Sequence, residues 1–286
     1  MPELPEVETV RQTLQNLILD KRIIDCYAPY DRIIKHISFL EFKQAIQNQR
    51  ITNVWRKGKY LALILEHSSI VIHLRMEGKF FIRSVSDHIS KHEHVVFVLD
   101  DQSELRYQDT RKFGEMHLIH STKIEDIIQG SPIKRLGFEP FEWVGNEEVL
   151  FDMLRKKQTS IKAALLDQHI IAGLGNIYVD EVCFLTKLHP ETICNKLSKE
   201  DIYSIVKNAC IVLNKAISLG GTTIRSYTSI DGVHGRFQNE LFVHSREGLA
   251  CLTCESIIQK MRVAGRGTYY CPKCQMNQSD KVLKKE

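Results

Sequence analysis

Four cysteines near the carboxyl end of the chain have the spacing of a metal site. Cys251 and Cys254 form one C-x2-C pair, and sixteen residues separate it from a second pair, Cys271 and Cys274. Four thiolates at this spacing can close into one tetrahedral zinc site, as in a zinc ribbon. Two disulfides or a redox pair are the alternatives, and two such pairs at ribbon spacing favour zinc. The spacing predicts a module, not a function, because ribbons also serve as structural clips and docking surfaces.

Basic residues lie between the two cysteine pairs. Lys260, Arg262 and Arg266 stand on the segment that a metal would hold rigid, and Lys273 lies inside the second pair. A small, rigid, basic hairpin suits a polyanion such as nucleic acid.

The amino terminus carries a second possible chemistry. Pro2 follows Met1, so removal of Met1 would expose a secondary amine that can form an iminium with an aldehyde-like carbon. Glu3 and Glu6 could shuttle protons beside it. Proline and glutamate are also what a helix start prefers, so an ordinary helix start is the simpler interpretation of these residues alone. While Met1 is attached, the nitrogen of Pro2 is an unreactive amide.

Three further segments contain residues that could act at a site. Lys59 opens a strand beside Arg56 and Lys57. Three cations so close together usually lie on a solvated edge. A strand that then runs into the core would instead fix one of them at the start of the strand. The turns at 73–78 and 109–114 each place apolar or cationic side chains beside a glycine. Such side chains can wedge between bases, whereas a Met or Phe at a strand end is more often core.

The run HIIAGLGNIY has two glycines before a helix start at Asn176. Gly173 and Gly175 would leave backbone amides for a phosphate. A dinucleotide fingerprint is the competing interpretation, but no strand precedes the run and the third glycine is missing.

Composition sets the outer limits. The 286 residues are 43% hydrophobic, which allows two domains plus a ribbon, and the net charge is only +4, so nucleic-acid binding must come from local clusters. We expect a cytoplasmic protein without membrane spans, because neither a signal peptide nor a run of about 20 apolar residues is present. The other cysteines share no spacing and are expected to be ordinary reduced thiols: Cys26, Cys183, Cys194 and Cys210.

Periodicity separates the chain into a β-rich front and a helical back. Alternating runs predict hairpins over 60–74 and 94–108, and helices are expected at the amino terminus and over 39–49. A capping pattern at 198–201 starts a 3.6-residue period that Gly220 and Gly221 end. Two prolines and two glycines place the hinge between the halves at 130–140.

The strings MPELPEVETV, KYL, HLRMEG, LRYQDTRKFG, LGFEP, AGLGNIYVDE and GGTT, followed by the cysteine array, together resemble the formamidopyrimidine-DNA glycosylase family. Each string is weak alone, but their order covers nearly the whole chain. The resemblance implies an α+β multidomain fold. A β-sandwich with flanking helices would span 1–131, a helix-two-turn-helix domain 132–228, and a lesion loop, zinc ribbon and polar tail 229–286, with DNA in the cleft between the halves.

The resemblance also implies the reaction. The enzyme would excise oxidised purines, 8-oxoguanine and formamidopyrimidines, from double-stranded DNA and cleave the strand at abasic sites by β,δ-elimination. Pro2 would be the Schiff-base nucleophile, Glu3 the general acid, Lys59 a helper of proton transfer during elimination, and Arg266 a proton donor in the δ step.

The same resemblance implies the DNA contacts. Met76, Arg111 and Phe113 would fill the space left by the flipped nucleotide, with Arg111 facing the orphaned base. Asn176 and Arg266 would clamp phosphates. A single DNA clamp suggests a monomer. Further candidates for DNA contact are Glu6, His73, His92, Lys157 and Lys162. The segment 227–237 would close over the extruded base, unless it is an ordinary mobile loop.

Three residues depart from the family pattern. His244 and Ser245 stand where the family usually has Tyr-Gly, and Glu255 follows Cys254 where Gly is usual. We expect them on the rim of the ribbon, where they would affect docking more than metal binding. Two alternatives stay open: an endonuclease VIII-like glycosylase for oxidised pyrimidines, and a catalytically silent protein that binds damaged DNA.

Overall fold

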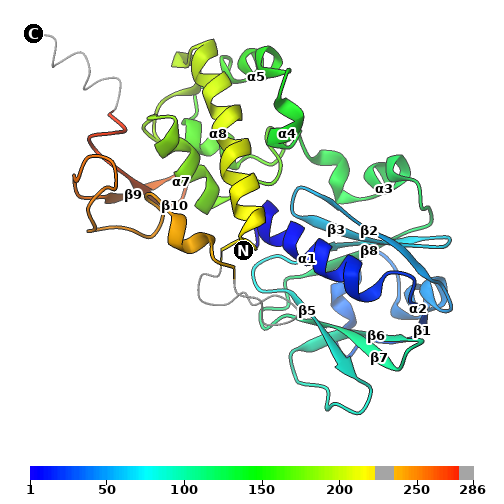
Figure 1. The fold of residues 1–286 in the computed structure, drawn as a ribbon. Coiled ribbons are helices and arrows are strands. Elements are labelled where there is room, and N and C mark those ends of the chain that lie inside the picture. The colour runs from blue at the N-terminus through cyan, green and yellow to red at the C-terminus, as the bar shows by residue number, and fades with distance from the viewer. Residues whose placement is uncertain (223–234, 277–286) are drawn as a thin grey trace, which may run out of the picture. The chain divides into compact units, whose positions relative to one another are not determined.

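The computed structural model describes residues 1–222 and 235–276, and the chain divides into two compact units (Figure 1). The amino-terminal unit comprises Met1–Arg135 and Leu219–Arg236. The carboxyl-terminal unit comprises Leu136–Ser218 and the chain from Phe237 onward. The boundaries expected for the three family domains stay a prediction.

Two antiparallel sheets of four strands form the amino-terminal unit. The first has the order β1-β6-β7-β5 and the second β2-β3-β4-β8. The strand bounds are β1 Ile23–Tyr27, β2 Ile51–Lys57, β3 Tyr60–Leu65, β4 Ser69–His73, β5 Lys79–Ser84, β6 Glu93–Leu99, β7 Ser103–Gln108 and β8 Glu115–Ile119. Both hairpins predicted from alternation are therefore confirmed, as β3–β4 and β6–β7.

The two helices expected in this unit, at the amino terminus and from residue 39, are present, and three shorter helical segments accompany them among the described residues. They are α1 Leu4–Ile18, η1 Asp31–Ile33, α2 Phe39–Ile46, α3 Ile124–Gly130 and η2 Pro132–Arg135. Pro5 lies in the first turn of α1, where its missing N–H costs nothing. The helix α2 ends three residues earlier than predicted, because Asn48 adopts a left-handed φ of 61° and donates its amide to Ile23 O.

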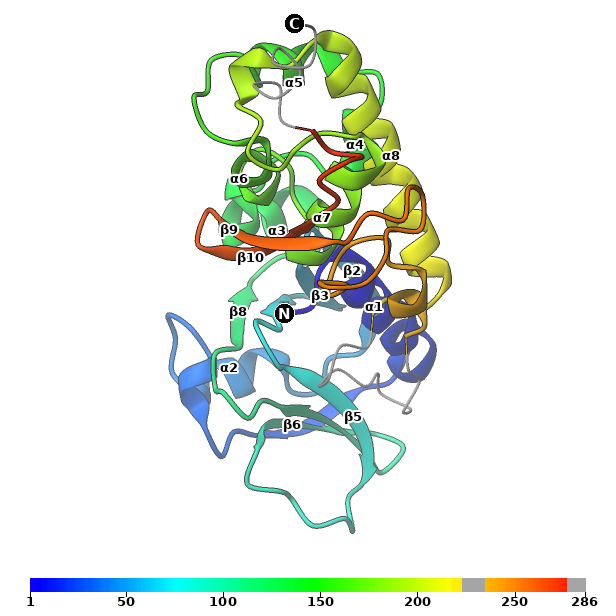
Figure 2. The same ribbon diagram turned by 90° about the vertical axis from the view of Figure 1, so that its left-hand side faces the viewer.

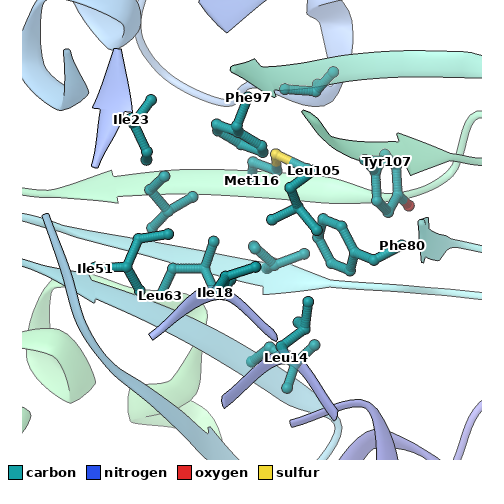
Figure 3. Close-up of a cluster of buried hydrophobic side chains, with 14 of the residues drawn as sticks. Leu14, Ile18, Ile23, Ile51, Leu63, Phe80, Phe97, Leu105, Tyr107 and Met116 are labelled. Atoms are coloured by element: carbon teal, nitrogen blue, oxygen red, sulfur yellow. The ribbon is translucent and has the colours of Figure 1, made fainter. Parts of the chain in front are cut away.

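The core of the unit contains apolar side chains of both sheets and of α1 (Figure 3). Leu14 and Ile18 of α1 are fully buried, as are Phe97 and Leu105 of the first sheet and Leu63 of the second. Burying each of these side chains contributes roughly 1.5–3 kcal/mol, so the strands are held in one register. The predicted sandwich is confirmed.

The carboxyl-terminal unit is helical and carries a β-hairpin. Its elements are α4 Pro140–Trp143, α5 Glu147–Leu154, α6 Ile161–Leu166, α7 Asn176–Leu185, η3 Cys194–Lys196, α8 Lys199–Ser218, η4 Phe237–Glu240, β9 Gln259–Val263 and β10 Arg266–Tyr270. Ser198 and Asp201 exchange hydrogen bonds at the start of α8, as the capping pattern predicts. Figure 2 shows the hairpin beside α7, which contacts β10. Among the described helices, none combines the length and the apolar character that crossing a bilayer requires.

The hairpin turn uses two residues with positive φ. Ala264 has a φ of 50° and Gly265 a φ of 74°, and Val263 pairs with Arg266 across them. Positive φ at both central residues is the type I′ geometry, whose twist matches that of the strands. Arg266 is consequently exposed at the first position of β10.

Two of the departures from the family pattern also lie in the left-handed region. Ser245 has a φ of 60° and Glu255 a φ of 64°. A side chain in this region meets its own backbone, which glycine avoids. The chain therefore keeps the backbone conformation without the residue that adopts it most readily.

Replacing these residues by glycine is expected to stabilise the ribbon. Ser245→Gly and Glu255→Gly should each raise the free energy of unfolding by up to about 1 kcal/mol, because the relief of φ strain exceeds the added chain entropy. Thermal and urea unfolding of the zinc-loaded protein would measure this change.

Gly248 supplies the matched control, since its φ is 81° and an added Cβ would meet nothing within 4 Å. Gly248→Ala should lose about 1 kcal/mol through the backbone alone. Lower stability of both glycine variants would contradict the strain argument.

Candidate functional site

The start of α1 holds the proposed nucleophile and its neighbour. Pro2 and Glu3 are buried, whereas Met1 is 47% exposed. The backbone N–H of Glu3 donates to Glu6 Oε2 at 2.9 Å. Met1 is thus exposed beside the buried Pro2, and Glu3, the N-cap of α1, is tied to the first turn of the helix.

Glu6 links this helix start to the segment before residue 223. Its Oε1 accepts hydrogen bonds from Thr222 N at 2.7 Å and Thr222 Oγ1 at 3.0 Å. Gly221, with a φ of 77°, packs so closely that an added Cβ would lie 2.7 Å from Glu6 Oε1. With only 3% of Glu6 exposed, the structure places it as a link between two backbone segments. The segment 227–237 is expected to cover the extruded base, and its residues 227–234 lie outside the described part of the chain.

Lys59 occupies the two-residue turn between β2 and β3. Gly58 has a φ of 57°, and its carbonyl accepts a hydrogen bond from Arg56 at 3.1 Å. Arg56 also donates to Glu8 Oε2 at 2.9 Å, so this guanidinium ties the turn to α1. Lys59 is only 5% exposed and is the buried one of the three cations. The tie explains how α1 and the Lys59 turn come together.

His73, at the end of β4, is a neutral residue. Its ring is 6% exposed, lies 4.4 Å from the Tyr60 ring, and accepts a hydrogen bond at Nδ1 from Arg75 N at 2.9 Å. Burial lowers the pKa of His73 to about 3, and the Arg75 and Lys59 charges act in the same direction. His73 can therefore give DNA an N–H donor at most, not a positive charge.

The proposed void-filling residues stand at strand ends. Arg111 is exposed, Phe113 is 52% exposed, and the Arg111 guanidinium lies 4.8 Å from the centroid of the Phe113 ring. Met76 and His92 are half-buried. Phe113 is thus outside the core, which removes the simpler explanation for an aromatic residue at this position.

Asn176 and Arg266 belong to one local structure in the carboxyl-terminal unit. Asn176 is the first residue of α7, and its Nδ2 donates to Gly267 O on β10 at 2.9 Å. Its Oδ1 is buried and has no hydrogen-bond partner among the described residues. The α7 amino terminus is thereby joined to the hairpin strand that presents Arg266.

Lys162, expected to contact DNA, is buried in an ion pair, and its role at DNA stays a prediction. The side chain is 0% exposed, and its Nζ lies 2.6 Å from Asp180 Oδ1 and 3.4 Å from Gly267 O. A buried ammonium needs such a partner to offset its lost hydration. Lys157, after α5, is half-buried.

His244 is not on the rim of the ribbon, contrary to expectation. It is 7% exposed, and its Nδ1 lies 2.7 Å from Asp180 Oδ2. Asp180 thus joins Lys162 and His244, while Glu181 accepts the three backbone amides of residues 242–244. Neither acid was predicted to have a role, although two adjacent carboxylates inside the otherwise apolar α7 are a usable signal in the sequence.

The four cysteines of the ribbon fit a zinc ion. Their sulfur atoms all lie within 4.8 Å of one another, with Sγ–Sγ distances of 3.9 Å between Cys251 and Cys274 and 3.4 Å between Cys254 and Cys271. Tetrahedral coordination with bonds of about 2.3 Å requires sulfur separations of roughly 3.8 Å. The set therefore holds one structural zinc.

The remaining cysteines behave as the sequence analysis expects. All four are free thiols. Burial raises the pKa of Cys26 and of Cys183 to about 12 and that of Cys194 to about 11. Thiols with such pKa values are poor nucleophiles at neutral pH.

Comparison with known families finds three matches along the chain. Residues 1–116 match the formamidopyrimidine-DNA glycosylase N-terminal domain, and residues 136–228 match its H2TH domain. Residues 248–277 match the zinc finger found in FPG and IleRS.

Individual proteins are similar over nearly the whole chain. The formamidopyrimidine-DNA glycosylase of Bacillus cereus is 45% identical over 276 residues, covering 96% of this chain and 99% of that one. Its counterpart from Oceanobacillus iheyensis is 43% identical, with 97% and 98% covered. Lactococcus lactis Fpg in complex with abasic-site DNA has a TM-score of 0.89 at 39% identity, over 96% of this chain and all of that one. An FPG mutant of the same organism, bound to Fapy-dG DNA, gives the same values.

Acid should destabilise the amino-terminal unit through His73. Below the ordinary histidine pKa near 6.5, His73 becomes protonated in the unfolded chain but stays neutral in the folded protein. Stability should therefore fall by up to about 1.4 kcal/mol per pH unit from pH 6.5 towards 3, and His73 should add no pH dependence above that range. His73→Asn, which keeps an acceptor near the Nδ1 position, should make the slope between pH 6.5 and 4.5 shallower.

Urea unfolding at intervals of half a pH unit would measure that slope. His67→Asn is the control, because His67 is an exposed histidine on the neighbouring β3–β4 turn. An unchanged slope in His73→Asn would refute the assignment.

Proposed function

The chain belongs to the formamidopyrimidine-DNA glycosylase family, the DNA glycosylases and abasic-site lyases of base-excision repair, and we propose that it excises oxidised purines through Pro2. The substrate is double-stranded DNA that contains 8-oxoguanine, a formamidopyrimidine or an abasic site. The observation that carries the proposal is the buried Pro2–Glu3 helix start, joined through Glu8 and Arg56 to the turn of Lys59.

Pro2 acts once Met1 has been removed. Its nitrogen bonds to C1′ of the damaged nucleotide, and the glycosidic bond breaks, so that the base leaves with the bonding electrons and takes up a proton. An amine nucleophile must be unprotonated, and an α-amino group titrates near pH 8 whereas a free lysine titrates near 10.4. At neutral pH this difference favours the terminal amine by roughly two orders of magnitude.

The sugar ring then opens: the C1′–O4′ bond breaks, O4′ takes up a proton, and the lone pair of the Pro2 nitrogen forms the iminium that drives strand cleavage. This iminium acidifies the C2′ proton, whose removal expels the 3′ phosphate in β-elimination, and a second elimination expels the 5′ phosphate. Glu3 supplies and accepts protons at the sugar, and Lys59 assists proton transfer during elimination. Arg266 donates a proton in the δ step.

Extrusion of the nucleotide leaves a gap in the duplex. Flipping costs a few kcal/mol of stacking and pairing. Met76, Arg111 and Phe113 fill the gap, and Arg111 donates to the acceptors of the orphaned cytosine. The exposure of Arg111 and Phe113 supports this role.

Phosphate contacts come from both units. In the carboxyl-terminal unit Asn176 and Arg266 hold phosphates of the flipped nucleotide, with Lys157 as a further contact, and His92 contributes from the amino-terminal unit. Asn176 exchanges its bond to Gly267 O for a phosphate oxygen. Each phosphate neutralised by a cation should steepen the log-log salt dependence of binding by about 0.9.

Zinc holds the ribbon that carries Arg266. Structural zinc supplies on the order of 10 kcal/mol to small modules that do not fold alone. The protein acts as a monomer in the cytoplasm, at the nucleoid when bound to DNA. The string PELPE, and the joint presence of Met76, Arg111 and Phe113, favour oxidised purines over the oxidised pyrimidines of the endonuclease VIII branch.

Borohydride trapping should yield a covalent protein–DNA adduct on an 8-oxoguanine duplex. Processed protein should give the adduct, because borohydride reduces the iminium to a stable amine. Pro2→Gly should lower the yield, and protein that retains Met1 should give none. The measurement is the shifted band on a denaturing gel.

The same gel separates the alternatives. Trapping on oxidised-pyrimidine duplexes in preference to 8-oxoguanine would move the protein to the other branch of the family. Binding without any adduct from processed protein would identify a silent damage binder and sink the proposal.

Removing zinc should abolish DNA binding. Cys251→Ala leaves three thiolates and should release the metal, so the Arg266 hairpin loses its fixed position while the sandwich stays folded. Fluorescence anisotropy with an abasic duplex measures binding, and Cys210→Ala is the control at a free cysteine outside the ribbon. Normal binding by protein shown to be free of zinc would refute this role.

A further inference from the structure

The two turns that carry the proposed void-filling residues meet at one buried hydroxyl group. Tyr107, on β7, is 0% exposed. A Cβ added to Gly78 would lie 2.3 Å from Tyr107 Oη, and one added to Gly114 would lie 1.8 Å from it. Gly78 ends the Met76 turn and Gly114 ends the turn of Arg111 and Phe113. Both turns therefore pack against the same oxygen, with no room for another side chain.

A buried carboxylate fixes the second turn from within. Asp109 is 1% exposed, and its Oδ1 accepts a hydrogen bond from Arg111 N at 2.9 Å. Its Oδ2 accepts from Phe113 N and Gly114 N, each at 2.9 Å, and from the Tyr107 hydroxyl at 3.4 Å. The carboxylate thus binds the backbone of the residues whose side chains face outward.

The backbone of Asp109 is held as well. Its N–H donates to His92 O at 2.9 Å, and its carbonyl oxygen lies 2.7 Å from His94 Nε2. The backbone of Asp109 is therefore anchored to His92 and to His94 of β6, and a shift of Asp109 would break these two bonds. This anchorage joins the turn to the His92 backbone, which directly precedes β6.

We propose that Asp109 and Tyr107 are positioning residues that hold the Met76 turn and the Arg111–Phe113 turn at one fixed spacing. With this spacing preset, the three side chains enter the base stack together when the damaged nucleotide leaves. The inference rests on the proposed function and adds the residues that hold these three side chains, which together form the wedge, in a rigid arrangement. A loose turn would have to become ordered during extrusion, and the entropy lost would add to the free energy already needed to unstack and unpair the nucleotide.

Release of the damaged base and trapping at an abasic site should depend to different extents on the fixed spacing of the two turns. Release of 8-oxoguanine requires a paired base to leave the stack, so it depends on the wedge. Trapping at a preformed abasic site requires no base to be extruded. A variant that only loosens the wedge should therefore lose the first activity far more than the second, and it should also lose discrimination between cytosine and adenine opposite the lesion.

Asp109→Asn tests this with little change of size. The amide offers one oxygen and one NH2 group, so at least one backbone N–H of the turn then faces a donor. We expect the single-turnover release of 8-oxoguanine opposite cytosine to fall roughly 10- to 100-fold, the effect of losing one or two hydrogen bonds to a charged group. Trapping on the abasic duplex should fall less than about 3-fold.

Tyr107→Phe is the second variant and removes only the hydroxyl, keeping the ring contact with Phe80. It should shift the ratio of the two activities in the same direction by a smaller factor, and it decides the question if Asp109→Asn does not fold. Asp101→Asn is the matched control, because Asp101 also caps a turn, through Ser103 N and Oγ, but at the far end of the β6–β7 hairpin. It should leave both rates unchanged.

Equal losses on both duplexes, or no loss on either, would overturn the positioning role while leaving the proposed function intact. A wild-type protein that neither releases 8-oxoguanine nor forms an adduct at the abasic site would instead refute the proposed function itself. Thermal unfolding of every variant shows which losses come from a fraction of unfolded protein.

Discussion

The register of the antiparallel strands in the sandwich is the constraint on which the site depends. A slip of one residue would turn every core side chain of a strand toward solvent, so the apolar core allows one register. That register fixes where each strand ends, and the turns at these ends carry Lys59, Met76, Arg111 and Phe113. The candidate site residues of the amino-terminal unit are thus placed by the burial of core side chains.

Buried polar groups then refine what the core places. In the amino-terminal unit, Arg56 links α1 to the β2–β3 turn, and Glu6 links it to Thr222. In the carboxyl-terminal unit, Asp180 joins Lys162 to His244 beside the strand of Arg266. Because both partners lose their hydration, such pairs contribute little to net stability. An arrangement that separates the partners would leave a buried charge without a partner, so the pairs favour a single arrangement. Catalysis in general requires that the reacting groups be held in one geometry.

Two residues in and next to the ribbon hold a left-handed backbone conformation although they are not glycine. Ser245 and Glu255 hold left-handed conformations at positions where glycine would be unstrained. Zinc coordination by four thiolates far outweighs the roughly 1–2 kcal/mol that each such residue costs, so the backbone persists. His244 is part of the buried network around Asp180.

The sequence by itself determined the elements with strong local signals. Each of these signals depends only on neighbours along the chain, and each is confirmed: the alternation over 60–74 and 94–108, the capping pair Ser198 and Asp201, and the cysteine spacing. Only the tertiary structure decided the protonation of His73, the burial of Lys162 and His244, and the convergence of two turns on Tyr107. Those properties depend on groups that are distant in sequence, because desolvation and pairing are set by whatever packs against a side chain, which no local pattern records.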